Sequence, residues 1–337
     1  MTTADQRIPV TVLTGFLGSG KTTLLNRILS ERRGGRIAVI ENEFGEVGVD
    51  DALVLDAEEE VFEMNNGCIC CTVGGDLIRI LGTLMRRKDR FDAIVIETTG
   101  LADPGPVAMP FFMNDALRAQ LRLDAIVTLV DAKHVLTHLD EVKPDGVENE
   151  CVEQIAFADR IVLNKQDLVD AKELAEVTRR IRAINAAATV LPAVRCDVNL
   201  ADVLDVHAFD LDHVLATDPG FLDPDGEHQH DESVSSVGID VEGTVNVEKL
   251  DIWLSMLLVT HGPDLFRSKG VLNLTGTDHR YVFQGVHMMH DGDFGAPWRP
   301  GESRRNRMVF IGRNLDHAEI EASFRACLNG APVTAAP

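Results

Sequence analysis

The chain alternates between short apolar runs and segments with helical periodicity. Six runs rich in Val, Ile and Leu have the length of buried parallel strands, and helix-period segments lie between several of them. These runs occupy residues 8–13, 36–41, 93–97, 125–131, 160–164 and 189–194. Repeated strand, helix and strand units form right-handed crossovers in a sheet that helices cover on both faces. The first part of the chain is therefore predicted to be α/β with a mostly parallel sheet.

The pattern changes after residue 209. Residues 210–236 are rich in Asp, Gly, Pro and His and lack periodicity, which is typical of a linker. Beyond this linker, alternating segments and helix-period segments predict a smaller α+β domain. The alternating segments are 235–243, 270–276 and 280–286, and the helical ones are 247–261 and 314–328. We expect a first domain at 1–209, an acidic linker at 210–236 and a second domain at 237–330.

Composition narrows the classes of partner. The 32 basic and 54 acidic residues give a net charge of −22, which repels phosphate backbones and argues against a nucleic acid partner. The sequence has neither an N-terminal signal pattern nor eighteen consecutive apolar residues, so we expect a cytoplasmic protein without a membrane partner. In a reducing compartment, the six cysteines are expected to be thiols rather than disulfides.

Residues 15–22 read GFLGSGKT and match the phosphate-binding pattern G-x-x-x-x-G-K-[ST] between a predicted strand and a predicted helix. Its glycines let the backbone wrap a phosphate at a helix N-terminus. Lys21 is expected to reach the β and γ phosphates, and the Thr22 hydroxyl to bind Mg²⁺. A glycine-rich connection without a ligand is the alternative. The predicted nucleotide contacts here are Gly15, Phe16, Leu17, Gly18, Ser19, Gly20, Lys21, Thr22 and Thr23.

The predicted strand at 160–164 ends in the sequence NKQD, residues 164–167. A carboxylate at Asp167 can accept hydrogen bonds from N1–H and the exocyclic amine of guanine, which adenine does not offer. Asn164 is expected to brace the phosphate loop and Lys165 to lie along the base. At the carboxyl end of a parallel strand, this motif predicts GTP as the nucleotide. A kinase that uses ATP is the disfavoured alternative.

Between these motifs, residues 94–100 read IVIETTG. Glu97 lies at a predicted strand end and joins Lys21 and Thr22 as a catalytic candidate, while an ordinary strand-terminal acid is the alternative. The backbone N–H of Gly100 is placed to sense the γ-phosphate. Because no Gln follows Gly100, slow intrinsic hydrolysis is expected, and Glu46 or Asp50 are weak candidates to position the attacking water.

The segment NNGCICCTVGGD, residues 65–76, holds Cys68, Cys70 and Cys71 within four positions. Three thiolates on one short loop can converge on a soft or borderline cation, and tetrahedral geometry favours zinc. A redox pair, or one buried apolar cysteine among the three, is the alternative. The isolated cysteines are expected to pack in the core or to occupy quiet surface positions, and these are Cys151, Cys196 and Cys327.

Several motifs together resemble the CobW-like family of metallochaperone GTPases, which are related to the urease and hydrogenase maturation GTPases. They are GFLGSGKTTLLNRIL, IENEFGEVGVDD, NNGCICC, IETTGLADP, VLNKQDL, FRSKGVL and VFQGVH, and the resemblance as a whole extends over residues 8–328. The resemblance implies a SIMIBI-class P-loop domain followed by a CobW C-terminal domain. It also implies weak GTP hydrolysis and delivery of zinc or cobalt to client proteins.

The same resemblance implies Glu41 as a ligand of the transition metal beside Cys70 and Cys71. Cys68 is expected to join in one nucleotide state only, and Glu43 and Glu46 are reserve ligands. Residues 41–51 lie where such GTPases keep their first switch, and IETTGLADP opens the second. If the ligands span a switch, GTP and metal binding must be reciprocally coupled.

The resulting hypothesis is a GTP-hydrolysing metallochaperone that binds Zn²⁺ or Co²⁺ and transfers it to a metal-requiring client protein. A redox- or metal-sensing regulatory GTPase that delivers no metal is the alternative. The sequence leaves open the physiological metal, the client and the oligomeric state, including a homodimer.

Three weaker patterns remain. His228 and His230 form either a metal-collecting tract or a solvated pair, and His287 and His290 form either a ligand pair or strand packing. A helical apolar stripe is assigned to the core of the second domain, and it comprises Trp253, Leu254, Leu257 and Leu258.

Overall fold

The computed structural model describes residues 6–31, 36–41, 61–63, 73–86, 91–144, 149–209 and 234–329. The chain divides into two compact units. The first comprises residues 1–180 and 188–209, and the second comprises residues 181–187 and 210–337. Among the described residues, no helix is long and apolar enough to cross a membrane.

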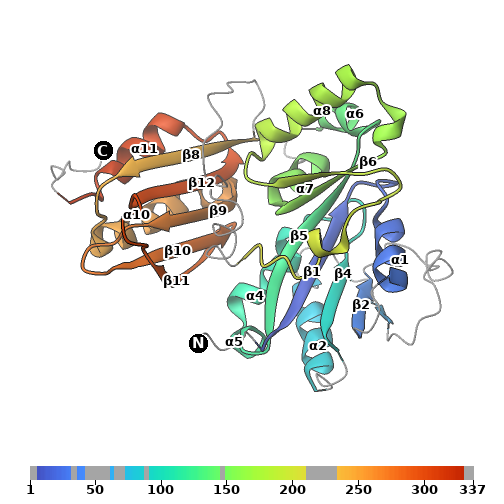
Figure 1. Ribbon diagram of the computed structural model, residues 1–337, viewed down its shortest axis with the longest axis horizontal. Helices are drawn as coiled ribbons and strands as arrows, with labels where there is room; N and C mark the ends of the chain where they lie inside the picture. The colour runs from blue at the N-terminus through green and yellow to red at the C-terminus, as the bar shows by residue number, and fades with distance from the viewer. Residues whose placement is uncertain are drawn as a thin grey trace. The chain divides into compact units, whose positions relative to one another are not determined.

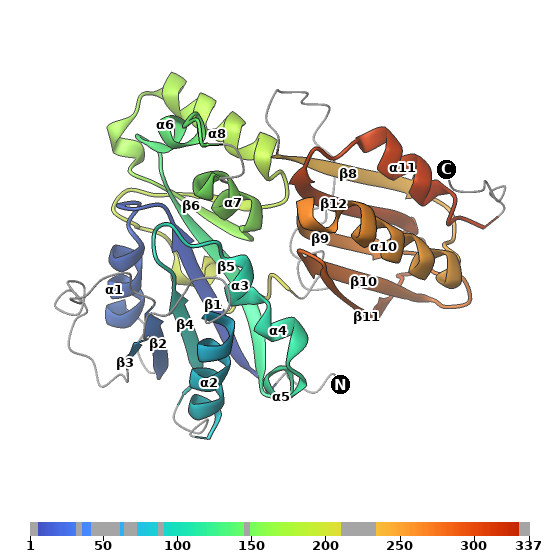
Figure 2. The ribbon, with the colours of Figure 1, turned by 180° about the vertical axis from the view of Figure 1, so that it is seen from behind.

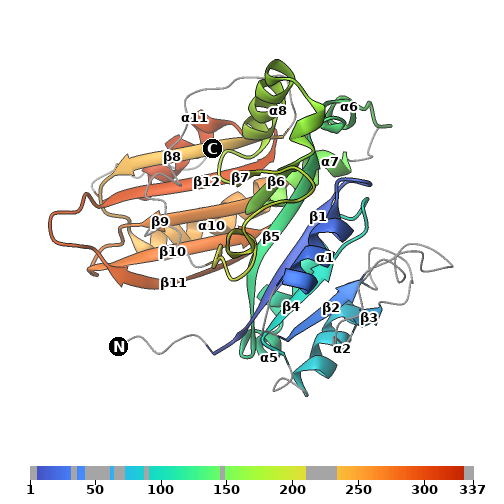
Figure 3. The same ribbon diagram turned by 45° about the vertical axis from the view of Figure 1, so that its right-hand side comes forward.

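The first unit is built on a seven-stranded sheet in the order β3-β2-β4-β1-β5-β6-β7 (Figure 1; β3 and β7 are labelled in Figure 3). Every neighbouring pair in it is parallel, so the predicted α/β fold is confirmed. The strands are β1 (Ile8–Gly15), β2 (Ile37–Glu41), β3 (Val61–Glu63), β4 (Ala93–Glu97), β5 (Leu121–Asp131), β6 (Arg160–Asn164) and β7 (Thr189–Pro192). β3, which was not predicted, is a three-residue edge strand.

Helices cover both faces of this sheet. Helix α1 lies on one face (Figure 3), and α2, α3 and α7 lie on the other (Figure 2). The helices are α1 (Lys21–Glu31), α2 (Val73–Met85), α3 (Gly105–Ala108), α4 (Pro110–Met113), α5 (Asp115–Arg118), α6 (Val135–Leu139), α7 (Glu150–Phe157) and α8 (Ala171–Ile184). Two short 3-10 helices, η2 (Gln166–Leu168) and η3 (Leu200–Asp202), follow β6 and β7.

Helix α1 shows why the central strands are apolar on both sides. Its buried residues Leu24, Leu25 and Ile28 pack with Leu13 of β1 and Val95 of β4 in one hydrophobic cluster. Because the opposite face of the sheet is also covered, strands such as β4, with the sequence AIVIE, have almost no exposed position.

The second unit contains a five-stranded antiparallel sheet in the order β11-β10-β9-β12-β8, with two helices on one face (Figure 2). The predicted smaller α+β domain is thus confirmed. Its elements are β8 (Val234–Glu242), α10 (Val247–His261), η4 (Gly262–Asp264), β9 (Leu265–Leu272), β10 (His279–Val286), β11 (Met289–Pro297), β12 (Arg305–Arg313) and α11 (His317–Arg325).

Helix α10 supplies much of the core of this unit. Trp253, Leu254 and Leu257 are buried in a cluster that also contains Phe310 of β12 and Phe324 of α11, and Leu258 packs at its margin. The assignment of this stripe to the core is therefore confirmed. Asn246 caps the helix, because its side chain accepts a hydrogen bond from the N–H of Lys249.

Candidate nucleotide-binding site

The loop between β1 and α1 is shaped by its glycines. Gly15, Gly18 and Gly20 have φ angles of 139°, 73° and 114°, which L side chains rarely adopt. A Cβ atom on Gly15 would lie 2.3 Å from the carbonyl oxygen of Leu129, and one on Gly20 would lie 2.7 Å from Nδ2 of Asn164. The loop backbone therefore approaches β5 and β6 too closely for any other residue.

Lys21 and Ser19 give this loop the character of an anion site. Nζ of Lys21 donates to the carbonyl oxygens of Gly15, at 2.9 Å, and Phe16, at 3.4 Å, so the ammonium lies inside the loop. Ser19 is fully buried, and its hydroxyl has no hydrogen-bond partner among the described residues. The N-terminus of α1 adds its positive dipole end. A phosphate group fits this set of donors.

The carboxyl ends of β1, β4 and β2 bring two glutamates next to the loop. Glu97 pairs in register with Leu13 on one side and with Glu41 on the other. The Thr22 hydroxyl lies 3.4 Å from Oε1 of Glu97. Glu41 is buried, and both glutamates make further contacts. The predicted metal ligand Glu41 is thus one strand away from the predicted catalytic Glu97.

The segment after β4 contacts the phosphate loop directly. A Cβ atom on Gly100 would lie 2.6 Å from Cδ2 and 2.9 Å from the backbone nitrogen of Leu17, so only glycine fits there. Thr98 anchors the segment to β1. Its N–H donates to the Leu13 carbonyl oxygen, and its hydroxyl donates to the Thr14 hydroxyl oxygen, both at 2.9 Å. The hydroxyl of Thr99 is buried without a partner among the described residues.

The NKQD segment lies at the other end of the loop. The Asn164 amide donates to the Ser19 carbonyl oxygen at 3.0 Å, which is the bracing contact expected from the sequence. Lys165 has a left-handed φ of 61°. Asp167 is exposed in η2, and Thr23 is exposed in the first turn of α1. The structure therefore brings the predicted phosphate and base residues to one edge of the sheet.

Asp131 is a residue of this site that the sequence reasoning missed. Its Oδ2 accepts from Nζ of Lys165 at 2.7 Å and lies 2.9 Å from Nδ1 of His134, and its Oδ1 accepts from the N–H of Lys133 at 2.9 Å. Burial raises the pKa of Asp131, but hydrogen bonds from Lys165, His134 and Lys133 outweigh burial and lower the pKa overall. Its place at the end of an apolar run was the available signal.

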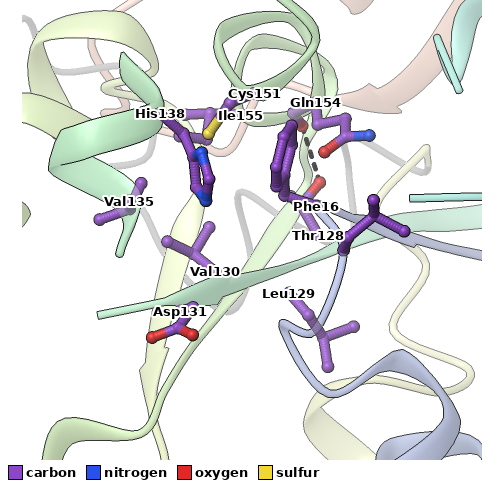
Figure 4. A pocket seen from close by; sticks show the side chains of 11 residues that line it. Phe16, Thr128, Leu129, Val130, Asp131, Val135, His138, Cys151, Gln154 and Ile155 are labelled. Carbon is purple, nitrogen blue, oxygen red and sulfur yellow. Dashed lines mark hydrogen bonds between the residues drawn. The ribbon is translucent and has the colours of Figure 1, made fainter. Parts of the chain in front are cut away.

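Gln154 of α7 is a second residue that was missed. Its side chain donates to the carbonyl oxygens of Gly100, at 3.1 Å, and Ala102, at 3.2 Å. Gln154 also lines a small pocket between the phosphate loop and the helices after β5 (Figure 4). In that pocket the Phe16 and His138 rings lie 4.0 Å apart between their centroids.

The predicted transition-metal site falls mostly outside the described residues. Only Glu41 of that site is described, and among the residues that the structure covers no three His, Cys, Asp or Glu side chains form a metal-binding group. His287 packs edge-on against Phe266, which agrees with the packing interpretation. The residues outside the described ranges are Cys68, Cys70, Cys71, Glu43, Glu46, Asp50, His228 and His230.

The isolated cysteines are buried thiols, as the packing interpretation predicts. Burial raises the pKa of Cys151 to about 12 and the pKa values of Cys196 and Cys327 to about 11. Cys196 also contacts the site, because its thiol donates to the Gly20 carbonyl oxygen at 3.4 Å and its N–H donates to Oδ1 of Asn164 at 2.9 Å.

The parallel sheet, the glycine-shaped loop and the buried Lys21 define a P-loop nucleotide-binding protein. Residues 9–192 match the CobW/HypB/UreG nucleotide-binding domain, and residues 234–328 match the cobalamin synthesis protein cobW C-terminal domain. The chain therefore belongs to the CobW/HypB/UreG family.

Two named relatives are similar to this chain along most of its length. The zinc chaperone YjiA of Escherichia coli is 38% identical over 322 residues, covering 94% of this chain and 98% of the relative. The zinc chaperone CobW of Pseudomonas aeruginosa is 34% identical over 353 residues, covering 96% and 92%.

Two solved structures are also similar to this chain along most of its length. The crystal structure of the Zn(II)-bound YjiA GTPase from E. coli has a TM-score of 0.76 at 32% identity, covering 95% of this chain and 99% of that one. A Zn(II)-bound YjiA triple mutant, with one glutamate and two cysteines replaced by alanine, has a TM-score of 0.75 at 32% identity, covering 96% and 99%.

Proposed function

We propose that this protein is a GTPase that binds zinc through Glu41, Cys70 and Cys71 and transfers it to a metal-requiring client in a nucleotide-dependent way. One observation carries the proposal. Glu41 and Glu97 are register partners at the strand ends beside the phosphate loop, and Glu97 reaches Thr22. The proposed metal ligand and the proposed magnesium-site residue therefore lie on adjacent strands, which would give a short path for coupling.

The nucleotide half of the proposal assigns a role to each part of the loop. Lys21 would leave the Gly15 and Phe16 carbonyl oxygens to bind the β and γ phosphates. Thr22 and Glu97 would hold Mg²⁺ directly or through water, and the ion would neutralise charge that develops on the phosphates. Asp167 would accept from guanine. Hydrolysis would be slow, because no glutamine follows Gly100 to orient water.

The metal half rests on donor chemistry and on one relative. Two adjacent thiolates and a carboxylate suit zinc, and cobalt is accepted by the same donors. In the YjiA triple mutant, the replaced glutamate and the first replaced cysteine are 29 positions apart, and 70 − 41 = 29 for Glu41 and Cys70 here. That mutant is still described as Zn(II)-bound. Zinc occupancy alone therefore does not identify the site, whereas nucleotide coupling does.

The cellular setting completes the proposal. We expect a cytoplasmic protein whose client receives zinc when the switch segments change state, with Cys68 as a ligand in one nucleotide state only. A homodimer across the nucleotide face is compatible with the same coupling. Linkage requires that the nucleotide state with the tighter zinc site be stabilised by zinc to the same extent.

The test is a competition titration of zinc and cobalt under reductant, with GDP and with a non-hydrolysable GTP analogue. Wild type is compared with Cys70→Ala/Cys71→Ala and with a matched control, His228→Ala/His230→Ala. We expect the cysteine variant to lose at least about 10-fold in zinc affinity and to lose the difference between nucleotides, since two thiolate ligands are removed. The histidine variant should keep that difference.

If zinc affinity is the same in wild type and the cysteine variant, and the same with GDP and the GTP analogue, the proposed chaperone function is contradicted. Disulfide formation within the cysteine cluster that changes GDP affinity would instead support the redox-regulated GTPase.

A further inference from the structure

A buried glutamine ties helix α7 to the segment that follows β4. Gln154 is 1% exposed, and its Nε2 donates to the carbonyl oxygens of Gly100 and Ala102 at 3.1 and 3.2 Å. Both amide hydrogens therefore have acceptors on the same short segment. Because these partners are 54 and 52 positions away in sequence, the contact links two elements rather than closing a local turn.

The segment held by Gln154 lies against the phosphate loop. Gly100 is in contact with Leu17, where an added Cβ would overlap the Leu17 side chain. Upstream, Thr98 is fixed to β1, and downstream the Asp103 carboxylate accepts from the N–H of Gly105 at 2.7 Å. Gln154 thus fixes the backbone between these two anchors, beside the place where a γ-phosphate would lie.

Helix α7 is itself fixed to the sheet. The Thr128 hydroxyl of β5 donates to the backbone carbonyl of Gln154 at 2.7 Å, drawn as the dashed line in Figure 4. Cys151 and Ile155 of the same helix line the pocket behind Phe16. The helix is therefore held against the sheet, lines the same pocket as Phe16, and reaches the Gly100 segment through one amide.

We propose that Gln154 is a positioning residue for recognition of the γ-phosphate. By holding the Gly100 and Ala102 carbonyls against α7, it presents the Gly100 backbone toward the terminal phosphate, so it favours GTP over GDP and supports hydrolysis. The inference rests on the proposed GTPase function, because the γ-phosphate is what distinguishes the two nucleotides. GDP has no γ-phosphate for this segment to contact, so the affinity for GDP is independent of Gln154.

The side chain chemistry explains the choice of variants. Methionine keeps the length of glutamine but has no donor for either carbonyl. Glutamate keeps the shape and turns a carboxylate toward two carbonyl oxygens, which is repulsive. Thr128→Val is the matched control, since it removes a buried hydrogen bond to the same residue of α7 while the Gln154 amide stays in place.

The experiment measures the affinities of wild type, Gln154→Met, Gln154→Glu and Thr128→Val for fluorescent GDP and a fluorescent non-hydrolysable GTP analogue with Mg²⁺. Single-turnover GTP hydrolysis and the melting temperature are measured beside them. We expect both Gln154 variants to bind the GTP analogue about 10-fold more weakly and to hydrolyse GTP more slowly, with GDP affinity within about twofold of wild type. Thr128→Val should lower the melting temperature and leave the ratio of the two nucleotide affinities within about twofold of wild type, because the Gln154 amide and the buried apolar side chains of α7, such as Ile155 and Phe157, stay in place.

If the Gln154 variants bind GDP and the GTP analogue more weakly by the same factor, Gln154 has a merely structural role and the inference is overturned. Folded Gln154 variants that keep the wild-type ratio of GTP-analogue to GDP affinity would also overturn it. A wild type that binds no GTP would overturn the proposed function and this inference with it.

Hydrogen exchange on the wild type needs no variant. Replacing GDP by the GTP analogue should change protection of peptides covering 98–105 and 150–157 together, and a change confined to the first would contradict the coupling.

Discussion

Each unit of this protein contains a buried asparagine with nearly the same hydrogen-bond chemistry. Asn164, in the first unit, donates to the Ser19 carbonyl oxygen and accepts from the N–H of Cys196. Asn306, in the second unit, donates to the carbonyl oxygens of Val241 and Gly243 and accepts from the N–H of Asn273. The partners of Asn164 belong to the nucleotide site, whereas those of Asn306 belong to strand ends and turns.

The difference shows that buried polarity alone does not mark a functional site. Around Asn164, the polar groups lie where parallel strands end, next to the phosphate loop. Around Asn306, the same kind of side chain closes the end of an antiparallel sheet next to an apolar cluster. We expect loss of the first to reduce ligand affinity and loss of the second to reduce stability.

The largest effect is expected from Lys21→Ala, which removes the charge inside the phosphate loop. GTP affinity should fall by about 1000-fold, because a preorganised charged donor to the phosphates is lost. The melting temperature should fall as well, since the carbonyl oxygens of Gly15 and Phe16 lose their donor. Calorimetric titration of GTP and GDP checks this, and retained affinity would show that the nucleotide binds elsewhere.

Asn306→Ala is expected to destabilise the second unit by about 3 kcal/mol, because buried backbone groups of Val241, Gly243 and Asn273 lose their partner. Both tryptophans, Trp253 and Trp298, belong to this unit, so their fluorescence during urea unfolding reports on it. Nucleotide affinity of the folded variant should equal that of wild type. If Asn306→Ala instead lowered nucleotide affinity and left the unfolding transition unchanged, Asn306 would have the role that we assign to Asn164.

Asn164→Ala is the counterpart in the first unit. We expect GDP and GTP affinity to fall by about 30-fold, because the Ser19 carbonyl and the Cys196 N–H lose the side chain that holds them together. The tryptophan unfolding transition should stay where it is in wild type. Fluorescent nucleotide binding measures the first effect, and a shifted tryptophan transition without loss of affinity would argue that Asn164 is purely structural.

Asp131→Asn tests the partner of Lys165. Affinity for both guanine nucleotides should fall by about fivefold, since the Lys165 side chain loses its ion pair. In a protein that already carries Lys165→Met, Asp131→Asn should cause no further loss of affinity. If the losses from the two substitutions add, Asp131 acts by a route other than Lys165.

The pH dependence of this ion pair follows from the lowered pKa of Asp131. A carboxylate with a lowered folded-state pKa contributes stability above its unfolded value of about 3.9, and loses that contribution as pH falls through the lower folded value. The difference in the free energy of unfolding between wild type and Asp131→Asn should therefore persist at neutral pH and vanish in acid. Urea unfolding at a series of pH values measures it.

The smallest effect concerns the isolated thiols. In a Cys68→Ala/Cys70→Ala/Cys71→Ala variant, the remaining three cysteines should not react with a thiol reagent at pH 8, because burial raises their pKa values to about 11 or 12. Denaturant should expose Cys196 with the first unit and Cys327 with the second. Rapid labelling of the native variant would contradict the buried positions.

The elements that could be predicted are those with strong local signals. The bounds of α10 match the helical segment expected at 247–261, and the phosphate loop follows from its glycines. Strand β11, with the sequence MHDGDFGAP, could not be predicted, because Gly and Asp disfavour strands and pairing with β10 holds it in place.

The same reasoning separates the site residues. Lys21 and Asn164 belong to short motifs, whereas Asp131 and Gln154 act through residues 34 and 54 positions away. Only the folded sheet brings those partners together, so local sequence patterns do not identify them.

Strand β1 precedes the other strands of its sheet in the chain, yet it occupies the centre of that sheet. Its partners β4 and β5 begin at Ala93 and Leu121, far along the chain from Gly15. At a synthesis rate of about 10 residues per second, roughly 10 s pass before β5 is complete. During that time the apolar segment IPVTVL has neither of its neighbouring strands, so both of its backbone edges are unpaired and open to pairing with another chain.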